Sequence, residues 1–176
     1  ITMVAGGTAD LSGSSSIDVL NVNDYTTGAD IIVTAGANGS VPLTVNATSQ
    51  DAGETMDFNG QNSTVGVTLN AGAGADSLDG GAGGDTINGN AGIDTIDGQA
   101  NSAVTGADNI SGGAGNDIIN VSTGESEFSN SSTTALVTDT VDGGAGTDTL
   151  EFKDAAATLT KAELANISNI ESLKLY

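Results

Sequence analysis

A nine-residue repeat is the feature that most limits how this chain can fold. From residue 71 to residue 97 the units AGAGADSLD, GGAGGDTIN and GNAGIDTID follow one another without a gap. Each unit has glycine at its fourth position, aspartate at its sixth and leucine or isoleucine at its eighth. A short repeat with a fixed frame is typical of solenoids, in which one unit buries its apolar face only by stacking on its neighbours. A low-complexity linker would not keep aspartate and an aliphatic residue in phase, so we expect an ordered stack.

The repeat frame returns after two insertions. Five extra residues at 101–105 precede GADNIS, the unit GGAGNDIIN starts at Gly112, and a Ser/Thr-rich stretch at 121–138 precedes DTVD and GGAGTDTLE. We therefore predict an all-β chain with a repeat region at residues 71–151. The insertions are expected to form surface loops.

The flanking segments read as parts of the same solenoid. Residues 1–70 contain IDVLNVND, GADIIVTAGANG and VGVTLNAG, which place short β-branched strands beside turn residues and indicate degenerate coils. Their apolar strand positions are Leu20, Ile32, Val45 and Leu69. In residues 152–176, Thr160 and Glu163 have capping-box spacing before a short helix over residues 161–165, and ESLKLY resembles a final strand. We predict a small C-terminal cap there.

Each nonapeptide is expected to form a glycine turn followed by a very short strand whose middle residue points inward. This places one ladder of apolar side chains in the core: Leu78, Ile87, Ile96, Ile110, Ile119, Val141 and Leu150. If two nonapeptides make one coil, each turn stacks on the turn two units ahead. The predicted aspartate pairs are then Asp76 with Asp94, Asp85 with Asp108, and Asp94 with Asp117.

The turns combine the donor atoms of a hard cation. Glycines at positions 1, 2 and 4 permit positive φ and close approach of the backbone, so carbonyl oxygens can converge, and the sixth-position aspartate adds a carboxylate. Calcium takes six to eight oxygen ligands, more than one turn can supply. Two stacked turns are therefore expected to share each ion, and metal binding and folding should be one event.

These units resemble the RTX family of calcium-binding proteins, most strongly over residues 71–120 and 143–151, and especially its surface-layer and large secreted members. The resemblance implies a right-handed parallel β-roll, export through type I secretion machinery, and calcium held by turn carbonyls and sixth-position aspartates. Asp139 matches less well because no glycine turn precedes it. Ala71, Asn90 and Gln99 depart from the double glycine of the motif. The implied ligand positions are Asp76, Asp85, Asp94, Asp108, Asp117 and Asp148, with turn glycines Gly72, Gly74, Gly81, Gly83, Gly92, Gly113, Gly115, Gly144 and Gly146.

The composition excludes several classes of function. With 23 acidic and 3 basic residues the net charge is -20, which repels nucleic acids and anionic membrane surfaces. No apolar run is long enough to span a membrane. The chain has no histidine and no cysteine, and hence no Ser-His-Asp or Cys-His catalytic set and no thiolate or imidazole zinc ligand. A glycosidase needs only two carboxylates, but the repeat aspartates are assigned to metal and no further acidic pair stands out, so we expect no enzyme.

Three functions fit this sequence. The first is a calcium-stabilised structural domain of an extracellular surface layer, adhesin or matrix filament, which self-associates. The second is the RTX secretion and folding module of a larger enzyme or toxin exported by type I secretion. The third, carbohydrate binding, is weakened by the acidity and remains open only for neutral sugars or contacts bridged by calcium.

Overall fold

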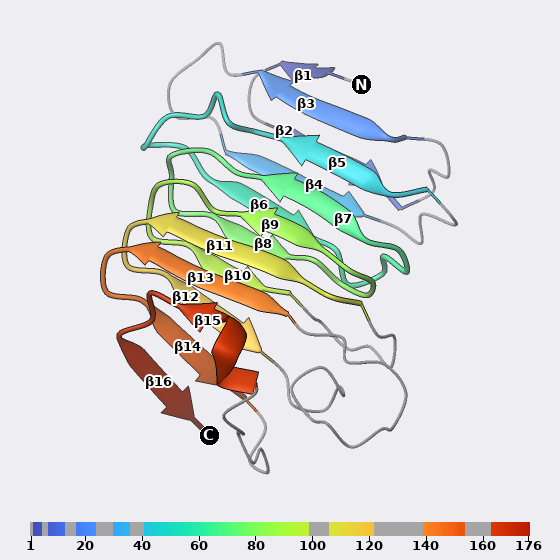
Figure 1. Cartoon of the computed structure of the whole chain (residues 1–176). Coiled ribbons are helices and arrows are strands. Elements are labelled where there is room, and N and C mark those ends of the chain that lie inside the picture. The colour runs from blue at the N-terminus through green and yellow to red at the C-terminus, as the bar shows by residue number, and fades with distance from the viewer. Residues whose placement is uncertain are drawn as a thin grey trace.

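The computed structural model shows one stack of parallel strands in two facing sheets (Figure 1). It describes residues 2–4, 7–12, 17–23, 30–35, 41–98, 106–121, 139–153 and 163–176. The chain crosses one sheet, turns, returns across the other and advances along the stack, so odd-numbered and even-numbered strands separate into different sheets. This is a β-roll, as the sequence predicts.

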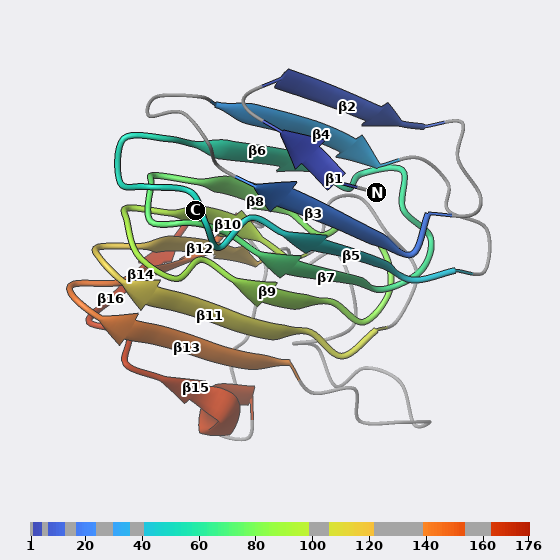
Figure 2. The ribbon, with the colours of Figure 1, turned by 90° about the horizontal axis from the view of Figure 1, so that it is seen from above.

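Within the described residues each sheet contains eight strands, which pair in steps of two along the chain. The odd sheet contains β1 (Thr2–Val4), β3 (Val19–Asn23), β5 (Leu43–Asn46), β7 (Val67–Asn70), β9 (Thr86–Asn88), β11 (Asn109–Ala114), β13 (Thr140–Ala145) and β15 (Ile167–Ser168). The even sheet contains β2 (Gly7–Leu11), β4 (Ile31–Ala35), β6 (Met56–Asn59), β8 (Ser77–Asp79), β10 (Thr95–Asp97), β12 (Ile118–Val121), β14 (Thr149–Phe152) and β16 (Ser172–Leu175). Figure 2 shows both sheets from above, with strands from distant parts of the chain side by side.

The predicted apolar ladder is the core of the repeat region. In the odd sheet Ile87, Ile110 and Val141 lie in register, and in the even sheet Leu78, Ile96, Ile119 and Leu150 do so. All seven are at most 2% exposed. The register confirms that two nonapeptides make one coil, because β8 pairs with β10 and β9 with β11.

The first coils hold together by apolar packing over longer strands. β5, β6 and β7 have four residues and bury two apolar side chains each, whereas β8, β9 and β10 have three residues and bury one. Asparagine side chains also form a ladder along the odd sheet, with Nδ2 of Asn46, Asn70 and Asn88 each donating to Oδ1 of the asparagine one coil earlier. Leu20, Val45 and Leu69 are buried as expected, but Ile32 is 44% exposed, and its neighbours Ile31 and Val33 point inward instead.

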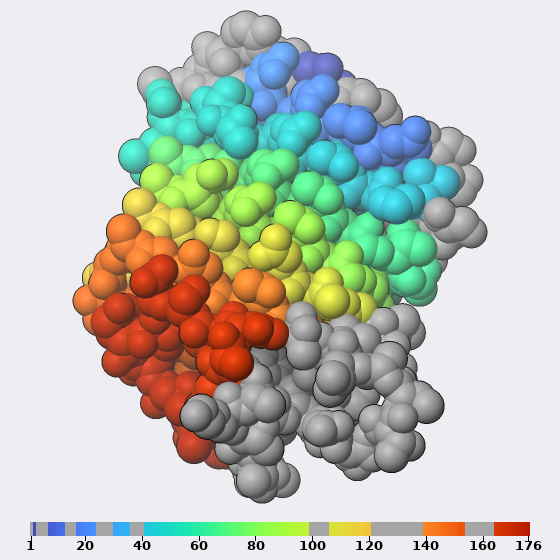
Figure 3. All heavy atoms as spheres, in the orientation of Figure 1, coloured from blue at the N-terminus to red at the C-terminus, as the bar shows by residue number. Residues whose placement is uncertain are grey.

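The C-terminal segment continues the roll rather than ending it with an α-helix. The predicted helix is a 3-10 helix at Glu163–Asn166, and its proposed N-cap at Thr160 lies outside the described residues. The final strand is present as β16. The space-filling view shows the coils as successive bands from the first to the last (Figure 3). Within the described residues no helix could cross a lipid bilayer.

Candidate metal centres in the turns

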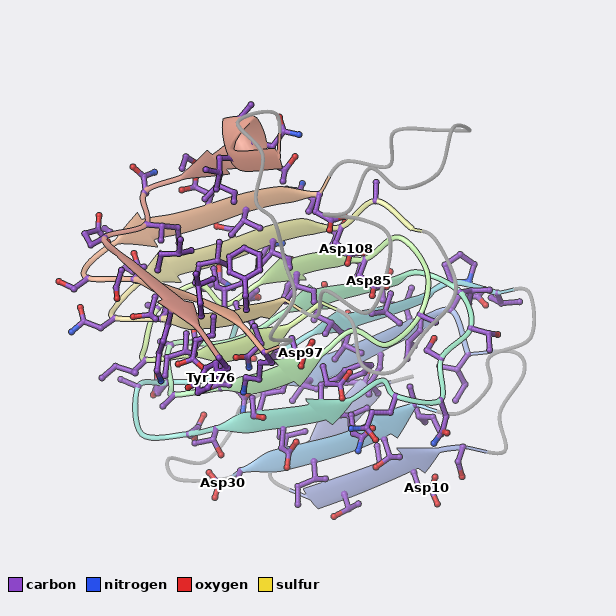
Figure 4. The ribbon with its side chains drawn as sticks, turned by 90° about the horizontal axis from the view of Figure 1, so that it is seen from below. Asp10, Asp30, Asp85, Asp97, Asp108 and Tyr176 are labelled. Atoms are coloured by element: carbon purple, nitrogen blue, oxygen red, sulfur yellow. The ribbon has the colours of Figure 1, made fainter. Side chains whose placement is uncertain are left out.

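Every sixth-position aspartate comes directly before a strand. Asp76, Asp94, Asp117 and Asp148 precede strands of the even sheet, and Asp85, Asp108 and Asp139 precede strands of the odd sheet. The side chains are at most 7% exposed. Because strands of the two sheets run in opposite directions within a coil, the aspartates form two rows along opposite edges of the roll. Figure 4 shows Asp85 and Asp108 of one row close together at the same edge.

A hydrogen bond links each aspartate to the next coil. The backbone N–H of Asp76 donates to Oδ1 of Asp94 at 2.8 Å, Asp85 donates to Asp108 at 2.8 Å, and Asp94 donates to Asp117 at 2.9 Å. These are the three pairs that the repeat spacing predicts. The rows continue with Asp108 N–H on Asp139 and Asp117 N–H on Asp148, both at 2.8 Å. Asp139 therefore holds a regular place in its row although no glycine turn precedes it.

In four of these aspartates the second carboxylate oxygen has no hydrogen-bond partner within the protein. Oδ2 of Asp85, Asp94, Asp117 and Asp148 is buried without a hydrogen bond. A buried, unpartnered carboxylate oxygen is strongly disfavoured unless a cation or a proton neutralises it. Burial accordingly raises the pKa of Asp85 and Asp94 to about 7. It raises the pKa of Asp76 and Asp139 to about 6.

Backbone carbonyls of the following coil border the same space as these free oxygens. A Cβ added at Gly112 would lie 2.5 Å from Asp117 Oδ2 and 2.5 Å from the Gly143 carbonyl oxygen. A Cβ at Gly89 would overlap Asp94 Oδ2 and approach the Gly112 carbonyl oxygen to 2.5 Å. Glycine at the first position of a repeat thus keeps open a space with oxygens from two coils around it.

Glycines at the second and fourth positions give the turns their path. Gly81, Gly83, Gly92, Gly113, Gly115, Gly144 and Gly146 all have φ between 91° and 153°. Asn90 replaces a second-position glycine and adopts φ 70°, a conformation that asparagine tolerates better than most residues. Its departure from the motif therefore leaves the turn intact, and that of Gln99 lies outside the described residues.

The first repeat turn differs from the others. Gly72 and Gly74 do not adopt the left-handed conformation that we expected from the motif. A Cβ at Gly74 would overlap the Glu54 carbonyl, so glycine is required there by close stacking on the preceding coil. Asp76 Oδ2 accepts the Gly72 N–H at 3.2 Å, so this carboxylate is already partnered. This turn packs on a loop of the preceding coil that lacks the repeat, which explains why its backbone conformation differs from that of the later turns.

The donor set fits calcium. The free oxygens are carboxylate and carbonyl oxygens, which are hard ligands, and they come from two coils, as a shell of six to eight ligands requires. No group of three or more acidic, histidine or cysteine side chains converges on one point within the described residues. Carbonyl oxygens must therefore supply much of each shell. Asp85, Asp94, Asp117 and Asp148 are the residues whose free oxygens would hold an ion.

Ninth-position residues have a role that the sequence did not reveal. Asp142 Oδ1 accepts the Gly144 N–H at 3.2 Å, and Asn59, which pairs with the ninth-position Asp79, accepts the Gln61 N–H on its Oδ1 at 3.1 Å. These side chains close the start of the turn. Burial and the neighbouring charge of Asp97 raise the pKa of Asp79 to about 6. The frequent occurrence of Asp or Asn at position 9 is the sequence signal that could have indicated this role.

Comparison with protein-family models identifies the repeats. Residues 68–99, 102–125 and 138–152 match the RTX calcium-binding nonapeptide repeat in four copies. Neither the curated proteins nor the solved structures gave a match. The matched residues include all six predicted aspartates. The chain therefore carries RTX calcium-binding repeats, and these repeats bind calcium ions.

Proposed function

We propose that this calcium-binding β-roll is a structural, non-enzymatic domain that acts outside the cell, in a surface layer, adhesin or matrix filament. In this proposal the chain folds when calcium binds and then assembles with further copies. The RTX repeat is a calcium-binding structural motif, which supports the non-enzymatic part. Calcium abundant enough to fill such turns is available outside cells, which supports the location.

The continuity of the stack favours a structural role. Both sheets extend from the first coils, which pack without repeats, through the repeat coils and into the C-terminal cap. The buried aspartates lie in the turns between coils and serve to join them. Such an arrangement resists bending and presents the same edges along its length.

Exposed leucines on the strand β16 support the assembly proposal. Within the described part of the chain, β1 and β2 at one end, and β15 and β16 at the other, have a strand neighbour on one side only. Leu173 and Leu175 of β16 are 48% and 61% exposed, although Leu173 continues the column of Leu150. An apolar parallel edge can pair with another chain. The net charge of -20 keeps metal-free chains apart, and bound calcium reduces this repulsion.

Light scattering and negative-stain electron microscopy across a calcium titration test this proposal. Rods or two-dimensional arrays should appear as calcium rises, and Leu173→Lys should reduce them without changing calcium binding. A strictly monomeric roll at millimolar calcium and high protein concentration contradicts the assembly proposal.

A secretion and folding module of a larger exported enzyme or toxin is the alternative. The raised pKa values of Asp85 and Asp94 fit this function as well as the first, because ionised, metal-free turns oppose folding where calcium is scarce. This module would fold on calcium as a monomer. The same titration therefore distinguishes the two functions.

A further inference from the structure

We propose that the calcium sites extend one turn beyond the last recognisable repeat, and that residues 169–171 of the C-terminal cap close a site together with Asp148. The inference rests on calcium binding by the repeats. It assigns a metal-binding role to a segment without the nonapeptide motif, outside the residues that match the family model.

Asp148 supplies a free oxygen in a fully buried position. The side chain is 0% exposed, and its Oδ1 accepts the Asp117 N–H at 2.8 Å, as in every other pair of the row. Its Oδ2 is buried and has no partner. Asp148 therefore presents the same unsatisfied oxygen toward the next coil as Asp94 and Asp117 do.

The cap supplies the carbonyl that a following repeat would supply. A Cβ at Gly143 would lie 2.8 Å from Asp148 Oδ2 and would overlap the Asn169 carbonyl oxygen. At Gly112 the corresponding oxygens are Asp117 Oδ2 and the Gly143 carbonyl. The Asn169 carbonyl thus occupies the place of the first-position glycine carbonyl in the next coil.

The strand register explains this equivalence. Asp142 of β13 pairs with Ser168 of β15. Asn169, the residue after Ser168, therefore lies opposite Gly143, the residue after Asp142. Asn169 has φ 52°, and its Nδ2 donates to Asp142 Oδ1 at 2.6 Å. The Asn169 carbonyl therefore lies in register with the first-position carbonyls of the repeats, although its left-handed backbone differs from that of Gly112 and Gly143.

Glu171 takes the position of the next aspartate in the row. Its Oε2 accepts the Asp148 N–H at 2.8 Å, and the Ser172 N–H donates to the Asp148 carbonyl at 3.0 Å. The turn has only Asn169 and Ile170 before Glu171, and the longer glutamate side chain spans the remaining distance. The cap therefore reproduces both contacts of a repeat turn with different residues, and its donors are the hard oxygens that calcium prefers.

Two substitutions of Asn169 in the full chain test this site. Asn169→Gly and Asn169→Val both remove the amide that bonds Asp142, but only glycine tolerates φ 52° without strain. Calcium bound per chain is counted by equilibrium dialysis, and hydrogen exchange follows the Glu171 and Ser172 amides, which both donate to Asp148. Asn169→Gly should keep the wild-type ion count, whereas Asn169→Val should weaken one site by about tenfold and expose these amides.

Asp148→Asn provides a second test against the exposed charge-matched control Asp57→Asn. The Asp148→Asn variant should bind one calcium ion fewer, and its Ser172 amide should lose protection from hydrogen exchange. In the presence of calcium its Thr95 amide, which donates to the Asp76 carbonyl, should stay protected. Asp57→Asn should change neither. Equal ion counts for Asn169→Val and Asn169→Gly, with the Glu171 and Ser172 amides protected in both, would overturn this inference and leave the proposed function intact. Wild-type protein that binds no calcium would instead overturn the proposed function.

Discussion

Removal of calcium should make the stability of the roll depend on pH in the opposite sense to a protein whose carboxylates are stabilised by ion pairs. Asp85 and Asp94 have pKa values near 7 in the fold against 3.8 for an ordinary aspartate, with desolvation as the main cause. A proton is therefore bound more tightly in the folded chain than in the unfolded chain. This contribution to stability is fully present below about pH 3.8 and is lost as the pH rises through 6 to 7.

The magnitude is large enough to decide whether the metal-free chain folds. One pKa unit corresponds to about 1.4 kcal/mol, so ionised Asp85 and ionised Asp94 each oppose the metal-free fold by at most about 4 kcal/mol, and solvent screening lowers this value. Asp76 and Asp139, with pKa values of about 6, add smaller terms of the same sign. Typical domains have only about 5–15 kcal/mol of net stability. The metal-free chain should be unfolded at pH 7.5 and gain β structure near pH 4.5.

Circular dichroism of calcium-free, dialysed protein between pH 4.5 and 7.5 measures this effect. The melting temperature should fall with rising pH, and saturating calcium should restore folding at pH 7.5. The double variant Asp85→Asn, Asp94→Asn should weaken the pH dependence without calcium. A calcium-free protein whose melting temperature rises or stays constant over this interval would refute the reasoning.

Three further predictions concern the ion itself. Asp94→Ala should weaken calcium binding in isothermal titration by about tenfold or more, whereas Asp79→Ala should have little effect. Of the two residues, only Asp94 forms hydrogen bonds to both adjacent turns of its row. Equal losses of affinity would mean that diffuse charge binds calcium. Gly89→Ala should abolish one site by filling the space beside Asp94, while Gly53→Ala, whose Cβ meets nothing within 4 Å, should leave the ion count unchanged. Magnesium should restore far less β structure than calcium in circular dichroism, since its strict octahedral shell suits bent carbonyl turns poorly.

The repeat region could be predicted because two positions determine its geometry. The sixth-position aspartate and the eighth-position aliphatic residue recur in a fixed frame, so the pairing of Asp85 with Asp108 across a five-residue insertion followed from counting coils. The first coils lack this frame. In β4 the run Ile31, Ile32 and Val33 is apolar throughout, and a sequence alone does not show which residues face inward.

The cap could not be read from the motif because it uses other residues for the same contacts. Asn169 and Glu171 sit in a shortened turn without a double glycine, so spacing gave no signal for their position beside Asp148. The short helix was predicted near its true place, but four residues at Glu163–Asn166 form only a 3-10 turn. The hydrogen bond of the ninth-position Asp142 to the turn backbone became visible only in the fold.

Crystallography of the calcium-bound chain with anomalous scattering at the metal tests the central claim most directly. Ions should lie in two rows between successive turns, each within about 2.3–2.6 Å of a sixth-position carboxylate oxygen and a carbonyl oxygen of the next coil. The pair formed by Asp117 Oδ2 and the Gly143 carbonyl is the clearest place to look, because both border the space above Gly112. Anomalous peaks confined to exposed carboxylates, with none between the turns, would contradict the account.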